Sequence, residues 1–295
     1  MSIITFATQW DKTVRDYQAT DDHLHVLMGA PDFFTVAEGH NNHMYDENGN
    51  LQQIDLATAK KQWQQIHDSF CSAGIKVDVL EGRPGLADLV FTANPSFVLP
   101  FHKHVWRGQM AHQSRRSETE IHINYFQQRG YQIFNLDDST IRFEGHGDSG
   151  WHPRRYLLHA AVGQRTELAA WEQINAAYPD LDILLYELQN PDFYHLDTAL
   201  AALDETTALV VESAFSDASL ELINQAFPDA IYLNEFEAYN FAGNAFCPDT
   251  KNVFIEQGCD DLKSKLAAKN FCMHELATQQ FRMSGGSVFC MKQSF

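Results

Sequence analysis

Residues 55–100 read DLATAKKQWQQIHDSFCSAGIKVDVLEGRPGLADLVFTANPSFVLP, and this stretch contains one complete unit of the predicted fold. Apolar side chains recur at helical spacing from Asp55 to Ala73, which predicts an amphipathic helix. The apolar run IKVDVLE, which starts at Ile75, predicts a strand. Residues 87–100 then read as a hairpin-like stretch with polar side chains at its start. One unit therefore consists of a helix, a strand and a hairpin.

The same unit recurs along the rest of the chain. Four more windows have helical periodicity and are each followed by a short apolar strand, namely 113–129, 166–178, 217–227 and 259–270. The five strands start 56, 50, 48 and 42 residues apart, at Ile75, Tyr131, Leu181, Asp229 and Phe271. A period near 50 residues indicates a radial or solenoid array rather than two domains. We therefore expect five α/β units in one domain that covers residues 1–295.

The composition limits the partners that the chain can have. Its 295 residues include 21 Lys and Arg against 39 Asp and Glu, which gives a formal net charge of −18. Because nucleic-acid affinity rests on clustered basic side chains, we expect no nucleic-acid partner. A dispersed acidic surface is usually just a solvent-exposed surface, although its field can also attract small cationic ligands.

Two further features predict a cytoplasmic protein. No apolar run reaches the roughly 18 residues that would span a bilayer, and residues 1–16 lack the basic start and apolar core of a secretory signal. The five cysteines form an odd set without CxxC spacing, which predicts reduced thiols and neither a disulfide framework nor a zinc site. We expect no membrane partner and no metal.

Chemically useful side chains occur at equivalent points of the five units. Equivalent points of a closed radial array lie near a common axis, so residues far apart in sequence can meet there. The side chains at these points are Asp88, Glu144, His195, Asn244 and Cys290. A carboxylate pair, an imidazole and a thiol at one axis would form a nucleophilic site. Taken singly, a cysteine in a strand is more often inert core, so this prediction depends on the combination.

Four segments resemble the signature segments of the guanidino-group-modifying enzymes: ADLVFTANPSFV (87–98), FEGHGDSG (143–150), YHLDTALAAL (194–203) and SGGSVFCM (284–291). These enzymes include arginine deiminase, dimethylarginine dimethylaminohydrolase, arginine dihydrolase and the amidinotransferases. The resemblance runs from about Met28 to the C-terminus, with the motifs in the family's order. It implies the pentein fold, a five-bladed α/β propeller, which agrees with the repeat count.

The resemblance also implies the catalytic residues. Cys290 matches the nucleophile, His195 the general acid and base, and Glu144 the acid that supports the histidine or contacts substrate. Asp197, two residues after His195, matches the aspartate that grips the guanidinium in deiminases. The implied reaction is attack of a thiolate on the guanidino carbon, followed by hydrolysis of a covalent thiouronium intermediate without a cofactor.

Further residues of the chain match substrate-binding positions. Asp88 and Asn94 bracket the first motif, Asn41 lies in a segment like the family's substrate-access loop, and Asp148 shares a glycine-containing acidic turn with Glu144. Two positions match the arginines that recognise the substrate's α-carboxylate. One is Arg115 or Arg116, and the other is Arg165. The sequence does not decide between the two neighbouring arginines.

The first motif favours one member of the family. Deiminases and dimethylargininases typically have a carboxylate six residues after the first aspartate, whereas this chain has Asn94 six residues after Asp88. The FTAN, FEGxGD and HLDTA segments together most resemble arginine dihydrolase, which converts arginine to ornithine, ammonia and carbon dioxide. The alternatives are a dimethylargininase or deiminase that gives citrulline, an amidinotransferase, and a non-catalytic pentein that only binds a ligand.

Overall fold

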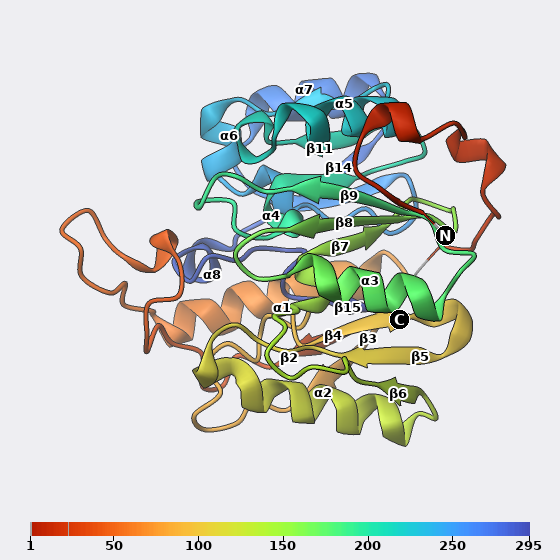
Figure 1. Cartoon of the computed structure of the whole chain (residues 1–295). Coiled ribbons are helices and arrows are strands. Elements are labelled where there is room, and N and C mark those ends of the chain that lie inside the picture. The colour runs from red at the N-terminus through yellow and green to blue at the C-terminus, as the bar shows by residue number, and fades with distance from the viewer. Residues whose placement is uncertain (1, 23) are drawn as a thin grey trace.

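The computed structural model describes residues 2–22 and 24–295, and in this part of the chain the strands form five small sheets (Figure 1). Each sheet contains a parallel pair of strands that are connected by a helix. The five predicted helices and the strands that follow them are therefore confirmed. Each of these strands begins within two residues of its expected start.

The five parallel pairs have the same order of strand, helix and strand. In chain order they are β2 (His25–Gly29), α1 (Leu56–Ser72) and β3 (Lys76–Leu80); β5 (His104–Arg107), α2 (Arg116–Gln128) and β6 (Gln132–Phe134); β8 (Leu158–Val162), α3 (Leu168–Ala177) and β9 (Ile183–Glu187); β11 (Ala208–Val210), α5 (Asp217–Ala226) and β12 (Ile231–Tyr232); and β13 (Asn252–Glu256), α7 (Asp260–Ala268) and β14 (Cys272–Leu276).

An antiparallel strand extends four of the sheets, as the hairpin-like stretches predict. These strands are β15 (Gln293–Ser294) beside β2, β4 (Ser96–Leu99) beside β5, β7 (Ser149–Trp151) beside β8, and β10 (Leu200–Ala202) beside β11. A single antiparallel bridge between Phe246 and Phe254 takes this place in the fifth sheet. The N-terminal β1 (Ile3–Ile4) adds to the outer edge of β9.

Helix α1 shows why the sequence forms these elements. The Asp55 side chain accepts hydrogen bonds from the backbone N–H groups of residues 57 and 58, and this N-cap starts the helix. Trp63, Ile66 and Phe70 are buried on one face, at the spacing of successive turns. Gly74, with φ of +82°, adopts the left-handed conformation that ends the helix and directs the chain into β3.

Buried polar loops meet where neighbouring units touch. The short helix α4 (Leu196–Ala199) contacts both of the 3₁₀ turns η6 (Gly145–Gly147) and η8 (Ala242–Asn244), and β4 contacts η6. These segments carry Glu144, His195 and Asn244 or lie next to them, and the side chains of these residues are at most 2% exposed. Residues at equivalent points of different units therefore converge.

Two short helices complete the elements, α6 (Glu235–Tyr239) and α8 (Gln279–Arg282). The long segment before α1, drawn in orange, extends beyond the sheets on the side where α8 lies (Figure 1). Within residues 2–22 and 24–295, every helix is too short or too polar to cross a membrane.

Candidate active site

Cys290 lies in a buried cluster with Asn244 and Asp197. Its Sγ atom donates a hydrogen bond to Asp197 Oδ2 at 3.0 Å and accepts one from Asn244 Nδ2 at 3.1 Å. The side-chain oxygen of Asn244 accepts hydrogen bonds from the backbone N–H groups of Ser287, Phe289 and Cys290 at 3.0–3.2 Å. Asn244 therefore holds both the sulfur and the turn that carries it.

The electrostatic surroundings keep the sulfur protonated in the free site. Burial raises the pKa of the Cys290 thiol well above its usual value, and the neighbouring Asp197 raises it further. Burial also raises the pKa of Asp197 to about 7, although the hydrogen bond from Cys290 and the charge of Lys292 lower it. A cation bound beside the sulfur would reverse this balance, because a nearby positive charge favours the thiolate form.

His195 and Glu144 form a second cluster. His195 Nε2 lies 2.8 Å from Glu144 Oε2, and Arg165 Nη1 lies 3.3 Å from the same carboxylate oxygen. Burial raises the pKa of Glu144, but the charge of Arg165 and the hydrogen bond with His195 outweigh it and hold this pKa well below its usual range. The ionised carboxylate orients the imidazole, as a general acid and base requires.

The turn between Glu144 and Asp148 is packed against this histidine. A Cβ atom at Gly147 would lie 2.3 Å from Asn94 Nδ2 and 3.1 Å from His195 Cδ2, so a side chain there would displace both residues. Asp148 Oδ1 accepts a hydrogen bond from the backbone N–H of Leu196 at 3.1 Å. Asp148 thus holds the backbone next to His195.

Arg115 connects the polar residues of the first motif. Its guanidinium lies 2.8 Å from Glu118 Oε2, 3.1 Å from Asn94 Oδ1 and 3.7 Å from Asp88 Oδ2. Arg115, Glu118, Asn94 and Asp88 are all buried. This arrangement leaves the Nδ2 atom of Asn94 buried and without a hydrogen-bond partner among the described residues.

A small pocket of about 10 Å³ lies beside Cys290 and His195. Seven residues predicted from the sequence line it, namely Asn41, Asp88, Asn94, Arg115, Arg165, His195 and Cys290. A neighbouring cavity of about 70 Å³ shares His40, Asp88 and Arg115 with this pocket. Glu38, whose side chain is exposed, also lines this neighbouring cavity.

Four predicted residues lie outside this pocket. Glu144, Asp148 and Asp197 are buried behind its wall, where they contact His195, the adjoining backbone and Cys290. Arg116 donates from Nε to the Met110 carbonyl oxygen at 3.3 Å and lines a separate cavity. The structure therefore brings Arg115, and not Arg116, to the pocket that Cys290 lines. In the described part of the chain, no group of three or more His, Cys, Asp or Glu side chains is arranged to hold a metal ion.

Comparisons with known proteins identify the family. Residues 30–294 match the family described as N,N dimethylarginine dimethylhydrolase, eukaryotic. The chain belongs to this family. The dimethylarginine dimethylaminohydrolase of Mycobacterium tuberculosis is 32% identical over 263 residues, which cover 89% of this chain and 83% of that protein.

This member of the dimethylarginine dimethylaminohydrolase family is also similar to a second kind of enzyme. The bifunctional arginine dihydrolase/ornithine cyclodeaminase ArgZ of Synechocystis is 30% identical over 273 residues, which cover 92% of this chain but 37% of ArgZ. The crystal structure of the ArgZ N-terminal domain, an Asn-to-Ser variant covalently bound to a reaction intermediate, has a TM-score of 0.85 at 28% identity and covers 92% of this chain and 97% of that domain. The chain is a hydrolase that acts on linear amidines, and its five units are the blades of a pentein propeller.

The site of this family member contains two residues whose roles become clear only from their contacts. Asn244 is predicted from its equivalent position alone, and its hydrogen bonds with Cys290 show what it does. Tyr194 donates from its hydroxyl to the Gly285 carbonyl oxygen at 2.6 Å, and its ring lies 4.6 Å from the Arg165 guanidinium carbon. Tyr194 directly precedes the predicted histidine, and only this position beside the HLDTA motif could have signalled its role.

Proposed function

We propose that the chain is an arginine dihydrolase of the cytoplasm that needs no cofactor. In the proposed reaction, arginine and two water molecules give ornithine, carbon dioxide and two ammonia molecules. The proposal assigns Cys290 as the nucleophile, His195 as the general acid and base, and Glu144 as the carboxylate that supports the imidazole. The hydrogen-bonded pairs around the pocket support these assignments.

The side-chain amide of Asn94 is the observation that favours dihydrolase. Its oxygen accepts from Arg115, so the amide nitrogen points to Gly147, which packs against His195, and is a buried donor with no hydrogen-bond partner among the described residues. A dihydrolase must bind a neutral ureido group after the first hydrolysis, and an N–H donor can hydrogen-bond the new oxygen of that group. A carboxylate at this position would repel the same oxygen.

The charges around the pocket also suit a guanidino group. The nearby Asp88 and Asp197 carboxylates match the positive charge that arginine brings to this part of the site.

The first half of the proposed reaction replaces one nitrogen. Entry of the guanidinium favours the Cys290 thiolate, which forms a bond to the central carbon. His195 donates a proton to one terminal nitrogen, and the carbon–nitrogen bond breaks to release ammonia. The thiouronium intermediate remains on the sulfur. His195, now neutral, takes a proton from water, and the resulting hydroxide displaces the sulfur to leave the ureido product.

The second half repeats these steps on the ureido carbon. Attack by the thiolate and protonation by His195 release the second ammonia, and a second water molecule breaks the carbon–sulfur bond. The product is a carbamate, which loses carbon dioxide to give ornithine. Asn94 would hold the ureido oxygen throughout this half, so the proposed donor is needed mainly after the first ammonia has left.

An assay of products tests the proposal. The full chain is incubated separately with arginine, Nω,Nω-dimethylarginine and agmatine, and ornithine, citrulline, ammonia and dimethylamine are measured. A dihydrolase forms two ammonia molecules for each ornithine from arginine. Citrulline with one ammonia would identify a deiminase instead, and transfer of the amidino group to an added amine would identify an amidinotransferase. Failure to convert any guanidino compound would leave the binding protein as the remaining alternative.

The second candidate is dimethylarginine dimethylaminohydrolase. The family match over residues 30–294 and the relative from Mycobacterium tuberculosis favour it. Release of dimethylamine with citrulline, and no ornithine from arginine, would select this activity and overturn the dihydrolase proposal.

A further inference from the structure

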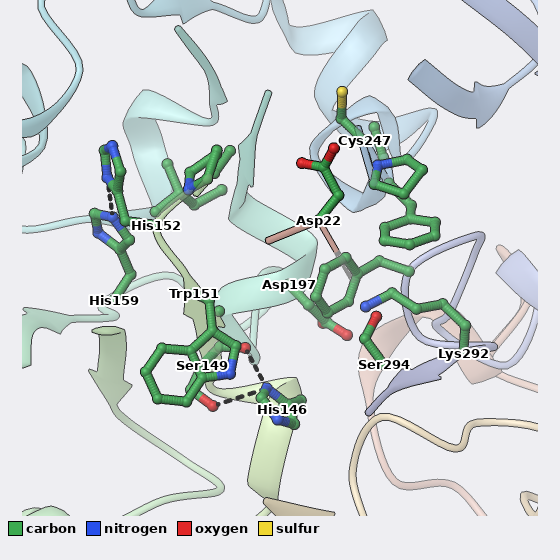
Figure 2. Close-up of a pocket in the computed structure, with 18 of the residues that line it drawn as sticks. Asp22, His146, Ser149, Trp151, His152, His159, Asp197, Cys247, Lys292 and Ser294 are labelled. Carbon is green, nitrogen blue, oxygen red and sulfur yellow. Dashed lines mark hydrogen bonds between the residues drawn. The ribbon is translucent and has the colours of Figure 1, made fainter. Parts of the chain in front are cut away.

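A second cavity lies behind the nucleophile. It has a volume of about 100 Å³, and both Asp197 and Lys292 line it (Figure 2). Asp197 is the residue that accepts the Cys290 thiol hydrogen bond from the other side. Asp197, which lines this cavity, is therefore hydrogen-bonded to the sulfur that lines the substrate pocket.

Lys292 is buried to a degree that is rare for lysine. Its side chain is 3% exposed, and within the described residues its Nζ atom makes no hydrogen bond. Nζ lies 3.2 Å from the centroid of the Phe289 ring and 4.5 Å from that of Phe246, which is the geometry of a cation–π contact. Figure 2 shows the amine end turned toward Asp197.

Among the side chains that line this cavity, Lys292 is the one whose positive charge lowers the pKa of Asp197. The cavity's other titratable or charged side chains are Asp21, Asp22, His146, His152, Arg154, His159 and Cys247. Arg154 is paired with Asp22 at 2.7 Å. Burial lowers the pKa of His152 to about 3 and that of His159 well below its usual value, so both are neutral near pH 7. Beyond Asp197, Glu144 adds negative charge that raises the pKa of this carboxyl.

We propose that Lys292 is a positioning residue whose ammonium group compensates the charge of Asp197 and so makes the Cys290 thiol easier to ionise. A buried carboxylate beside a thiol opposes thiolate formation, and a cation on the far side of that carboxylate offsets the opposition. Lys292 reaches neither the substrate pocket nor the reacting carbon. It acts through Asp197 and the sulfur.

The titration of the cluster agrees with this arrangement. Burial lowers the pKa of Lys292 to about 7, although Asp197 and Cys290 raise it. Asp197 and Lys292 therefore titrate as one coupled unit near neutral pH, next to the Cys290 sulfur. Removing the lysine takes one positive charge from the unit, which raises the pKa of each remaining acid.

The test measures the reactivity of Cys290 without any substrate. The full-length wild type and Lys292→Met are treated with iodoacetamide at pH 6.5, where Lys292 carries its charge, and alkylation of the Cys290 peptide is followed by mass spectrometry, because Cys71 and Cys272 are exposed and also react. A loss of nearby opposite charge shifts a pKa by about 1–3 units, so we expect alkylation to slow at least tenfold. Lys292→Arg, which keeps the charge, should react within twofold of the wild type.

Two further variants separate this role from a structural one. Lys251→Met removes an exposed lysine and should leave the rate unchanged. Lys292→Gln keeps a polar side chain and is measured in case the Met variant does not fold; it should be as slow as the Met variant. Equal alkylation rates in wild type and the uncharged variants, or equal loss in Lys292→Arg, would overturn the proposal.

A second readout rests on the proposed function. In Lys292→Met, the acidic limb of the kcat/KM profile for the guanidino substrate should move up by at least about one pH unit, and Lys292→Arg should keep the wild-type limb. Because alkylation needs no turnover, a shift in alkylation without arginine hydrolysis would contradict the proposed function and leave the role of Lys292 intact.

Discussion

Replacing Asn94 by Asp should convert the proposed dihydrolase into an enzyme that stops at citrulline. The substitution removes the buried N–H donor that faces His195 and places a carboxylate oxygen in its position. The new charge lies near the Arg115 guanidinium, which is 3.1 Å from the Asn94 oxygen, so we expect the variant to fold. The guanidinium of arginine tolerates the carboxylate, whereas the neutral ureido intermediate loses its hydrogen bond.

The size of the effect follows from that lost hydrogen bond. Leaving a buried polar group without its partner costs about 1–3 kcal/mol, which corresponds to a roughly 5- to 150-fold slower second hydrolysis. The assay is the ratio of citrulline to ornithine formed from arginine over time, measured by chromatography. Asn48→Asp, at an exposed position, is the matched control for the added charge. An unchanged ratio in Asn94→Asp would refute the role given to the amide.

Three other perturbations test the rest of the site. Glu144→Gln removes the charge that supports His195 and should lower kcat about 10²- to 10⁴-fold, while KM for arginine changes little; an intact kcat would remove Glu144 from the machinery. Burial raises the pKa of Asp197 to about 7, so the carboxyl takes up a proton below this pH and loses its attraction for the guanidinium; kcat/KM should fall about tenfold per pH unit there, and a flat profile down to pH 5 would contradict this. Arg165→Ala should impair turnover and Arg116→Ala should leave it nearly unchanged, because Arg165 lines the pocket and Arg116 lines a different cavity; equal effects in steady-state kinetics would disprove the assigned geometry.

The five-unit fold follows from local signals in the sequence. Helical windows such as 55–73 alternate with short apolar runs at a steady spacing. The hydrophobic pattern of a connecting helix is recognisable even in the unit whose second strand, β12, has only two residues. The same regularity explains why the sequence alone is enough to group Glu144, His195 and Cys290. Each lies at the inner end of its unit, where a radial array brings separate segments together.

The finer geometry depends on directions that a sequence does not contain. Arg115 and Arg116 are neighbours at the start of α2, and the helical turn between them directs one side chain to the pocket beside Cys290 and the other to a different cavity. A lysine is normally expected at the surface. The burial of Lys292 becomes visible only when the rings of Phe246 and Phe289 are placed around it. Asn244 needs three backbone partners from a distant segment, which only the closed fold supplies.

The most direct measurement is the mass of the Cys290 peptide during turnover. The enzyme is mixed with arginine, quenched in acid within the first turnovers, digested and analysed by mass spectrometry. The account predicts that this peptide gains the mass of arginine less one ammonia, and that Cys290→Ser shows neither the adduct nor product. Turnover without any adduct on Cys290, or with the adduct on another cysteine such as Cys247, would contradict it.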